Sequence, residues 1–203
     1  MSESPLDEGL VDPDPIVEVR RWFEAALAAG IPNADAMVVA TATPVGEPSA
    51  RVVLLRGLDA RGFVFFTNYE SRKARELEAN PRAALVLYWE PLGRQVRVTG
   101  TVARASKAES EAYFTNRPPA SRLGAWASPQ SRAIGSRDEL EELLADVERR
   151  FGGSEPPVPP FWGGYRVTPE TIELWKHRDD RLHDRVLYAR LANGGWRIER
   201  LAP

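Results

Sequence analysis

The chain contains no cysteine, and among its 203 residues it has only two histidines, two methionines and three lysines. The absence of cysteine excludes disulfide bonds, thiolate catalysis and cysteine-ligated zinc or iron–sulfur sites. No apolar run approaches the roughly 20 residues that a membrane span needs. The first residues, MSESPLDEGLVDPDP, have neither the basic nor the apolar part of a signal peptide. These absences predict a cytoplasmic protein with no membrane association.

The charge balance excludes a second set of functions. The formal net charge is −2, which gives no broad attraction to nucleic acid or to anionic lipid. Hydrophobic residues at 43% and charged residues at 28% are ordinary for a globular protein, and the length suits one domain. We predict a flexible leader over residues 1–14 and a single domain over residues 15–203.

Short strand-like runs dominate the rest of the chain, and helix signals stand between them. Asp14 and Pro15 predict the start of a helix that stops at Gly30. Further helices are predicted at 71–80, from Ser106 to before Pro118, and from Ser136 to Phe151. Strands are predicted at 36–42, 50–58, 63–68, 82–90 and 94–104, and in a C-terminal hairpin that turns at 192–195. This order predicts a mainly β (α+β) fold, an antiparallel barrel or sheet with peripheral helices, and the lack of G-x-G-x-x-G argues against a Rossmann domain.

Both histidines lie in one short stretch, HRDDRLHDR, at residues 177–185. His177 and His183 are six residues apart, so they fit neither H-E-x-x-H nor a helical metal pair, and the chain has no G-x-S-x-G. A metal site on His183 with Asp179 or Asp184 is one alternative, but the flanking arginines oppose a cation, and we expect no metal. A solvated, charge-balanced loop is the other alternative.

Two segments indicate anion binding. Ser71, Arg72 and Lys73 fall in the first turn of a predicted helix, where free N–H groups and the helix dipole attract phosphate. The alternative for this segment is a solvated basic turn. Residues 52–55 predict a strand buried on both faces, and the arginines that bracket it, Arg51 and Arg56, could bind a phosphate or form structural ion pairs.

Aromatic residues gather at predicted strand ends or beside glycine and proline. They are suited to core packing or to stacking on a flat ring. The set is Tyr88, Trp89, Trp126, Phe161, Trp162, Tyr165 and Trp175. Together with the cationic segments and the lack of metal ligands, they indicate a phosphorylated aromatic ligand.

Several longer motifs resemble one protein family in consistent order, from about residue 15 to the final RLAP. They are RVVLLRG, FFTNYESRKARELEANPRAAL, RQVRVTG, YFTNRPPASRLGAWASPQS, PPFWGGYRV, IELW and RLHDR. The family is that of the pyridoxine (pyridoxamine) 5′-phosphate oxidases. The resemblance implies an antiparallel FMN-binding split β-barrel that forms a homodimer, with active sites at the interface and a C-terminal segment, about 160–203, for dimerisation and substrate binding.

The activity that the resemblance implies is the oxidation of pyridoxamine 5′-phosphate and pyridoxine 5′-phosphate to pyridoxal 5′-phosphate. The cofactor would be FMN, and dioxygen would accept the electrons and yield hydrogen peroxide. The implied FMN contacts are Arg51, Val52, Val53, Leu54, Leu55, Arg56, Phe66, Thr67, Arg72, Lys73, Gln95, Gln130, Ser131, Trp175 and Arg185. The implied substrate contacts are Arg56, Tyr113, Arg117, Ser121, Arg181, Leu182 and His183.

Arg181 and His183 are the implied catalytic residues. They would lie over the substrate ring and align its C4′ carbon with the flavin N5 for hydride transfer, so that the protein positions the reactants and the cofactor supplies the chemistry. We expect Arg185 to alternate in phase with them along an extended segment. His177 has no implied role and is predicted to be a solvated loop residue.

The chain departs from the family pattern at three places. Arg56 stands where lysine is usual, WKHRDD replaces a beginning of the W-Q-G type, and no Arg-x-x-Tyr-like lid segment precedes the domain. Two alternatives therefore stay open. One is a flavin oxidase of a secondary, phenazine-type pathway on the same fold. The other is a non-catalytic module that binds flavin, haem or pyridoxal 5′-phosphate.

Overall fold

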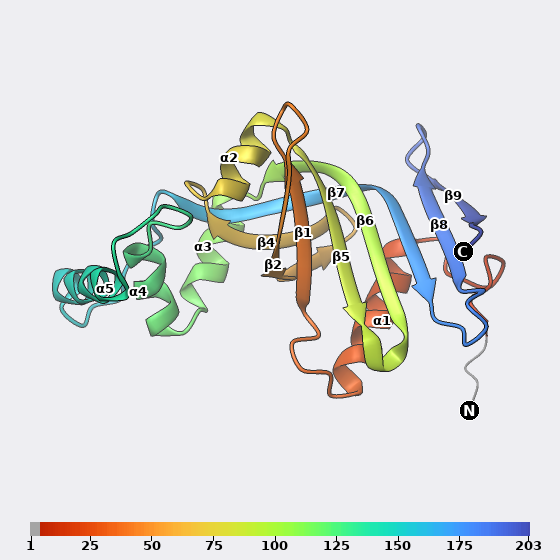
Figure 1. Cartoon of the computed structure of the whole chain (residues 1–203), viewed down its shortest axis with the longest axis horizontal. Coiled ribbons are helices and arrows are strands. Elements are labelled where there is room, and N and C mark those ends of the chain that lie inside the picture. Colours follow the sequence, from red (N-terminus) through yellow and green to blue (C-terminus); the bar gives the residue numbers. More distant parts are fainter. Residues whose placement is uncertain (1–4) are drawn as a thin grey trace.

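A nine-stranded antiparallel sheet forms the centre of the computed structural model, which describes residues 5–203 (Figure 1). The main path of the sheet runs β2-β1-β5-β6-β7-β4-β3, and the hairpin β8–β9 extends it from β7. The strands are β1 Ala36–Ala42, β2 Pro48–Leu54, β3 Gly57–Asp59, β4 Gly62–Asn68, β5 Arg82–Trp89, β6 Arg94–Arg104, β7 Trp162–Lys176, β8 Asp184–Arg190 and β9 Trp196–Arg200. Each strand pairs antiparallel with its neighbours, as the sequence predicted.

The long strand β7 connects the barrel to the C-terminal hairpin. One edge pairs with β6, while the other pairs first with β4, at residues 162–167, and then with β8, at residues 171–176. The register of β6 and β7 shifts between Thr99 and Gly100, where β7 has one extra residue before Gly100 pairs with Pro169, which has no N–H to give to the ladder. β7 therefore has two different neighbours on one edge and reaches both ends of the molecule.

The core follows the two-residue period of the strands. Alternate residues of β5, β6 and β7 point inward and are fully or almost fully buried, among them Leu85, Leu87, Val98, Ile172 and Leu174. Helix α1, Pro15–Ala28, covers this core through an apolar face that includes Val19, Trp22 and Ala26. The Asp14 side chain caps α1 by accepting from Ile16 N, and Gly30 ends it with φ +67°, as the sequence predicted.

The other helices lie at the edges of the sheet. They are α2 Arg72–Ala79, α3 Lys107–Thr115, α4 Pro119–Ala127 and α5 Arg137–Phe151, with a short 3₁₀ turn at Glu90–Leu92. The predicted capping box of Ser106 and Glu109 is present, and α5 ends at Gly152 in the left-handed region. The sequence analysis placed the end of a helix before Pro118 and did not predict α4. Pro119 occupies the first turn of α4, where a missing N–H costs nothing.

The prediction that residues 52–55 form a strand buried on both faces is wrong. β2 is an edge strand with β1 as its one neighbour, and alternate residues are exposed. Val52 is 64% exposed and Leu54 is 39% exposed. The continuous apolar run therefore leaves an uncovered apolar face on the single chain.

Residues 5–14, predicted as part of a flexible leader, are instead held against β8 and β9. Leu6 is buried, and its N–H donates to Asp184 Oδ2 over 3.1 Å. The Tyr188 hydroxyl donates to the Asp12 carbonyl over 2.9 Å. The other predicted leader residues, 1–4, lie outside the described part of the chain. Within residues 5–203, no helix has the length and hydrophobicity of a membrane span.

Replacing Gly100 by alanine should destabilise the fold. A Cβ at Gly100 would lie 2.0 Å from the Thr168 carbonyl oxygen, so the backbone of β7 would have to move. We expect a loss of about 2 kcal/mol or more in the free energy of unfolding, measured by urea denaturation at fixed protein concentration. Gly124→Ala in α4 is the control, because beyond the neighbouring residues and the backbone of its own helix no atom lies within 4 Å of the place that its new methyl group would take. Equal stability of the two variants would contradict the close strand approach.

Candidate active site

A cavity of about 300 Å³ lies between β2, β4, α2, α3 and the segment after α4. Its lining is made almost entirely of residues that the family resemblance had pointed to. They are Arg51, Val52, Val53, Leu54, Arg56, Phe66, Thr67, Lys73, Tyr113, Arg117 and Gln130, and Trp162 is the one addition. The fold thus brings together segments that are far apart in the sequence.

Lys73 is the buried cation of this cavity. Ser71 caps α2 by accepting from Ala74 N, which places Lys73 in the first turn, and the residue is only 8% exposed. Its Nζ donates to Gln130 Oε1 over 2.8 Å and to Thr67 Oγ1 over 3.1 Å. Burial and, to a lesser extent, the nearby Arg51 together lower the pKa of Lys73 to about 8, against the opposing effect of Glu76.

The buried carboxylate of Glu76 fixes two arginines beside Lys73. It accepts from Arg72 Nε over 2.8 Å and lies 3.5 Å from Arg51 Nη2. The hydroxyls of Thr41 and Ser49 also donate to it, over 2.5 and 2.6 Å. Burial acts to raise the pKa of Glu76, but these hydrogen bonds and the charge of Arg72 outweigh burial and hold the pKa at about 2.

Three cations around one carboxylate leave an excess of positive charge at the first turn of a helix. Burial lowers the pKa of Arg51 as well, with Glu76 opposing the shift. Free N–H groups of a helix start and clustered cations are the features that bind phosphate. Glu76 was not among the predicted site residues, because a glutamate inside a short helix is indistinguishable in sequence from a solvated one.

An aromatic stack forms part of the cavity lining. The ring of Phe66 lies parallel to the ring of Tyr113, with centroids 4.1 Å apart, and to the ring of Trp162, with centroids 5.4 Å apart. Trp162 begins β7 and is buried, and the sequence had marked it only as one of several aromatics beside glycine. The site therefore has a flat apolar wall next to its cationic end.

Arg117 is a second cation with an unmet hydrogen bond. Its guanidinium lies 5.0 Å from the Trp162 ring centroid, and its buried Nη1 has no hydrogen-bond partner among the residues described. Burial lowers the pKa of Arg117; Tyr113 opposes this, and Arg56 lowers it further. A buried guanidinium with a free N–H is costly unless an anion completes it, so this end of the cavity fits a second anionic group.

Four predicted residues near this cavity do not line it, and one of them, Arg72, lies beside it through its contact with Glu76. Ser121 is half-buried in α4, and Ser131 is exposed with a left-handed backbone, φ +70°. Leu55 is buried at the end of β2 and contributes to the core rather than to the cavity surface.

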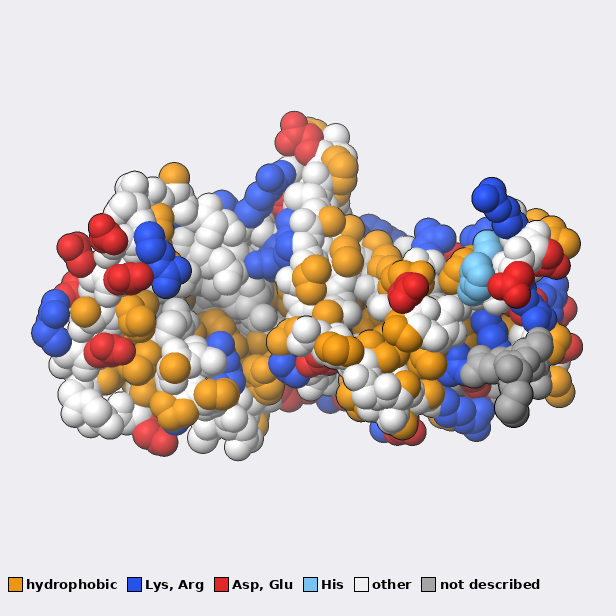
Figure 2. Space-filling view, turned by 60° about the horizontal axis from the view of Figure 1, so that its bottom comes forward, with side chains coloured by type: hydrophobic (Ala, Val, Ile, Leu, Met, Phe, Trp, Pro, Cys, Tyr) orange, Lys and Arg blue, Asp and Glu red, His pale blue; other side chains and the backbone are white. Residues whose placement is uncertain are grey.

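A second group of predicted residues lies on β6, β7 and β8. Gln95 pairs with Trp175, and Trp175 pairs with Arg185, so the three form one row across the sheet. The Trp175 ring lies 4.7 Å from the ring of His183. Figure 2 shows the histidine side chains at the end of the molecule that carries β8 and β9, opposite the end that carries α4 and α5 in Figure 1.

The loop before β8 holds His183 in one tautomer. The Arg178 N–H donates to His183 Nδ1 over 3.0 Å, so a neutral His183 carries its proton on Nε2. Arg181 is exposed and has φ +64°, and the Leu182 N–H donates to Asp180 Oδ1 over 2.9 Å. The prediction of an extended segment from Arg181 to Arg185 is therefore wrong before Asp184, because a left-handed turn precedes the strand.

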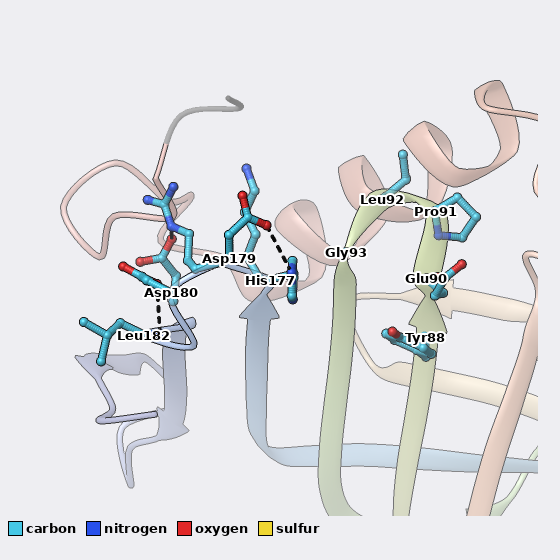
Figure 3. Close-up of a pocket in the computed structure, with 12 residues that line it drawn as sticks. Tyr88, Glu90, Pro91, Leu92, Gly93, His177, Asp179, Asp180 and Leu182 are labelled. Carbon is cyan, nitrogen blue, oxygen red and sulfur yellow. Dashed lines mark hydrogen bonds and ion pairs between the residues drawn. The ribbon is translucent and has the colours of Figure 1, made fainter. Parts of the chain in front are cut away.

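This loop forms one wall of a cleft of about 1040 Å³ (Figure 3). Tyr88 and Glu90 lie across the cleft from Asp180 and Leu182. His177 is exposed, as predicted, but it is not isolated: its Nε2 lies 3.5 Å from Asp179 Oδ1 and its ring 5.2 Å from the His183 ring. No cluster of three or more His, Asp or Glu side chains suited to a metal ion occurs in residues 5–203.

Within one chain, the residues that line the first cavity and the predicted residues on β6, β7, β8 and the loop before β8 do not form a common site. The first cavity is lined by none of Gln95, Trp175, Arg181, Leu182, His183 and Arg185. Trp162, at the start of β7, belongs to the cavity, whereas Trp175, near the end of the same strand, belongs to the row.

Structural comparison identifies the fold as a split barrel. A crystal structure of PhzG from Burkholderia lata, in complex with tetrahydrophenazine-1-carboxylic acid, matches all of this chain with a TM-score of 0.93 and 31% identity, over 99% of that protein. A pyridoxamine 5′-phosphate oxidase-related, FMN-binding protein from Nostoc punctiforme matches 91% of this chain and 97% of its own length, with a TM-score of 0.72 and 22% identity. The second match supports the fold alone.

Sequence comparison identifies the family. Residues 23–176 match the family described as pyridoxamine 5′-phosphate oxidase, and residues 162–203 match the pyridoxine 5′-phosphate oxidase C-terminal dimerisation region. A pyridoxine/pyridoxamine 5′-phosphate oxidase of Rubrobacter xylanophilus is 62% identical over 98% of this chain and 91% of its own length. One of Nostoc punctiforme is 53% identical over 98% and 92%. The chain belongs to the pyridoxamine 5′-phosphate oxidase family, as the motifs had indicated.

Replacing Glu76 by glutamine should destabilise the protein most at neutral pH. The carboxyl has its ordinary pKa of 4.5 when unfolded and a pKa of about 2 when folded. Its contribution, roughly 3 kcal/mol, is complete above pH 4.5 and is lost as the pH falls through 2. Urea unfolding should therefore show a large difference between Glu76→Gln and wild type at pH 7 and a smaller one at pH 3. Glu141→Gln, which breaks an exposed pair with Arg137, is the control. A difference that does not change with pH would contradict this role.

Proposed function

We propose that two copies of this chain form a homodimer that oxidises pyridoxine 5′-phosphate and pyridoxamine 5′-phosphate to pyridoxal 5′-phosphate, with FMN as cofactor and dioxygen as electron acceptor. The observation that carries the proposal is the cavity itself, which is lined by three aromatic rings and four cationic side chains. We call Arg51 and Lys73, with Arg72 beside them through Glu76, the first end of the cavity, and Arg117 and Arg56 its second end. A flavin nucleotide and a phosphorylated pyridine together need two phosphate sites and flat surfaces between them. The cytoplasmic location stays a prediction.

The residues of the first end fit the phosphate of FMN. Lys73 is buried at a helix start, and Glu76 keeps Arg72 and Arg51 beside it. Thr67 and Gln130 share hydrogen bonds with Lys73, so they would be fixed where the cofactor binds. When bound, FMN would supply the site with a two-electron acceptor that takes up a hydride. The protein would hold FMN with the arginines and with residues 51–56, which include the end of β2 and the two residues after it.

The second end fits the phosphate of the substrate. Arg117 has a free buried N–H, and Tyr113 stands beside it with its hydroxyl as a possible donor. We assign Ser121, from the neighbouring helix, to the same phosphate, although it does not line the cavity in the single chain. A substrate without phosphate would leave the Arg117 N–H unpaired, at a cost of about 1–3 kcal/mol.

The second copy would complete each site. β2 exposes Val52 and Leu54, and residues 162–203 match a dimerisation region. A two-fold dimer that covers β2 would bring the row of Gln95, Trp175 and Arg185 from one copy to the cavity of the other. The loop that contains Arg181, Leu182 and His183 would reach the same cavity together with that row, and Ser131 would lie near the flavin.

The proposed work of Arg181 and His183 is positioning. The Arg178 N–H occupies His183 Nδ1, which leaves Nε2–H as a hydrogen-bond donor toward the substrate. Arg181 presents a fixed positive charge from a strained turn, and such backbone strain is typical of sites where a side chain must point in one direction. Both residues would hold the substrate ring over the flavin and exclude water.

A phenazine-type oxidase is the second candidate, favoured by the close structural match to PhzG. The identity to that protein is 31%, against 62% to the Rubrobacter xylanophilus oxidase. Comparing turnover of pyridoxine 5′-phosphate with turnover of unphosphorylated aromatic amines distinguishes the two. A non-catalytic module that binds flavin or pyridoxal 5′-phosphate would produce no peroxide with either.

The direct test of the function is anaerobic reduction. Purified protein loaded with FMN is mixed with pyridoxamine 5′-phosphate in the absence of oxygen, and the flavin absorbance is followed. We expect the absorbance to bleach and to return when air is admitted, with formation of hydrogen peroxide. A flavin that stays oxidised with both phosphorylated substrates would refute the proposal.

Replacing Arg181 by alanine should lower turnover at least about 100-fold and leave FMN bound, because the residue would align the substrate and not hold the cofactor. Steady-state peroxide production and the flavin content after gel filtration measure the two effects. Arg197→Ala is the control, since Arg197 lies on β9 in an exposed pair with Glu199. Unchanged turnover in Arg181→Ala would remove the role proposed for this residue.

FMN affinity should fall at alkaline pH. Lys73 has a pKa of about 8 in the ligand-free protein, so above pH 8 binding must take up a proton. The dissociation constant should rise by up to about tenfold per pH unit above 8 and should change little between pH 7 and 8. Titration of FMN fluorescence at pH 7, 8, 9 and 9.5 measures the profile. Lys73→Met should bind more weakly with a flat profile, and a flat profile in the wild type would contradict the assignment.

A further inference from the structure

We propose that Asp35 is a positioning residue for the substrate phosphate: it holds one edge of the Arg56 guanidinium, so that the other edge faces the same anion as Arg117. The proposal rests on the function proposed above and names a residue outside the cavity that would set the affinity for the phosphorylated substrate. It also gives a role to the arginine that stands where the family usually has lysine.

The contact between Asp35 and Arg56 is short and its two ends are fixed by the backbone. Arg56 Nη1 lies 2.6 Å from Asp35 Oδ2. The Leu55 N–H donates to the Asp35 carbonyl over 2.8 Å, and the Arg56 N–H donates to the Val64 carbonyl over 2.8 Å. Asp35 directly precedes β1 and Arg56 follows β2, so the antiparallel register of these strands, which ends at Ala36 and Leu54, places the two residues together.

Arg56 also acts on Arg117. It lines the same cavity, and its charge adds to burial in lowering the pKa of Arg117. Two guanidiniums that repel each other need a fixed arrangement if both are to face one ligand. Arg117 is fixed by burial and by its contact with Trp162, whereas the Arg56 side chain is 31% exposed and has Asp35 as its ion-pair partner. The Asp35 carboxylate therefore restrains the Arg56 side chain, as burial restrains the side chain of Arg117.

The choice of arginine follows from its shape. A guanidinium is planar and presents N–H groups on more than one edge, so it can bind a carboxylate and a phosphate at the same time in fixed directions. A lysine ammonium is a compact charge on a flexible stem and offers no such fixed second edge. With Asp35 on one side, Arg56 and Arg117 retain a net positive charge for a phosphate monoester, which carries nearly two negative charges at neutral pH.

The test is the substitution Asp35→Asn in the FMN-loaded enzyme, with pyridoxine 5′-phosphate as substrate. We expect KM to rise about tenfold while kcat changes by less than about twofold. The substitution weakens the binding of the substrate phosphate by Arg56 and does not change the groups around the reacting atoms. Asp35→Glu should recover part of the affinity. Glu170→Gln, which removes the acidic partner of the exposed Arg82, is the control and should leave KM and kcat unchanged. An unchanged or lowered KM in Asp35→Asn would overturn the proposal.

A double-substitution cycle shows whether Asp35 acts through Arg56. Arg56→Lys removes the second edge, so adding Asp35→Asn to it should raise KM by less than about twofold further. An effect of Asp35→Asn that is equally large in both backgrounds would mean that Asp35 acts on something else, and would overturn the proposal.

Failure of this inference differs from failure of the proposed function. A wild-type protein with no turnover of either phosphorylated substrate would refute the function, whatever Asp35 does. The role of Asp35 then remains measurable by titrating pyridoxal 5′-phosphate into wild type and Asp35→Asn and following its absorbance. Equal affinities there would overturn the inference on its own.

Discussion

The continuity of β7 is the constraint on which the rest of the account depends. Trp162 at its first position stacks in the cavity, and Trp175 near its end lies in the row with Gln95 and Arg185. Thirteen residues of strand at about 3.3 Å each separate the two tryptophans by roughly 40 Å along the strand. Because β7 is hydrogen-bonded along both edges, the chain cannot fold the two groups onto each other. If both groups serve one site, they must come from two copies.

Charge is the second organising feature of the cavity. Glu76, buried and held ionised by hydroxyl and guanidinium donors, keeps two arginines near the ammonium of Lys73. At the other end, the chain leaves Arg117 without a full set of partners and gives Arg56 a carboxylate of its own. The cationic groups are thus in place before any ligand arrives, and ligand binding needs little rearrangement of them. This arrangement explains how a chain with a net charge of −2 can gather several cationic side chains around one cavity.

The sequence predicted most of the fold, because its signals were local. Asp14 and Ser106 cap the helices that they were expected to cap, and β1 and β6 have the predicted bounds. The errors arose where the outcome depends on distant parts of the chain. Residues 52–55 carry the apolar run of a buried strand, but whether such a strand is covered depends on its place in the sheet, and β2 lies at the edge. Residues 1–14 were predicted as a flexible leader, yet Leu6 is buried and donates its N–H to Asp184, 178 residues away.

For the candidate site too, the sequence predicted what local motifs contain and missed what depends on tertiary contacts. Motifs recovered nearly every residue that lines the cavity, but they did not indicate Glu76, Trp162 as part of the stack, or Asp35. Each of these acts through a neighbour brought to it by tertiary structure. The sequence could not predict the left-handed backbone at Arg181 either. The segment is polar and its pattern predicts an extended chain, whereas contacts of Asp180 and His183 determine the turn.

The central claim, that each site is completed by a second copy, is tested most directly by mixing two inactive variants. Arg117→Ala disables the cavity half, and Arg181→Ala disables the half carried by the loop before β8. If the two halves come from different copies, dimers formed by co-expression or joint refolding contain one intact site in each mixed pair, and random association of equal amounts restores about a quarter of wild-type activity. If both halves come from one chain, every site retains a defect, and the mixture stays as inactive as its components; that result would contradict the account.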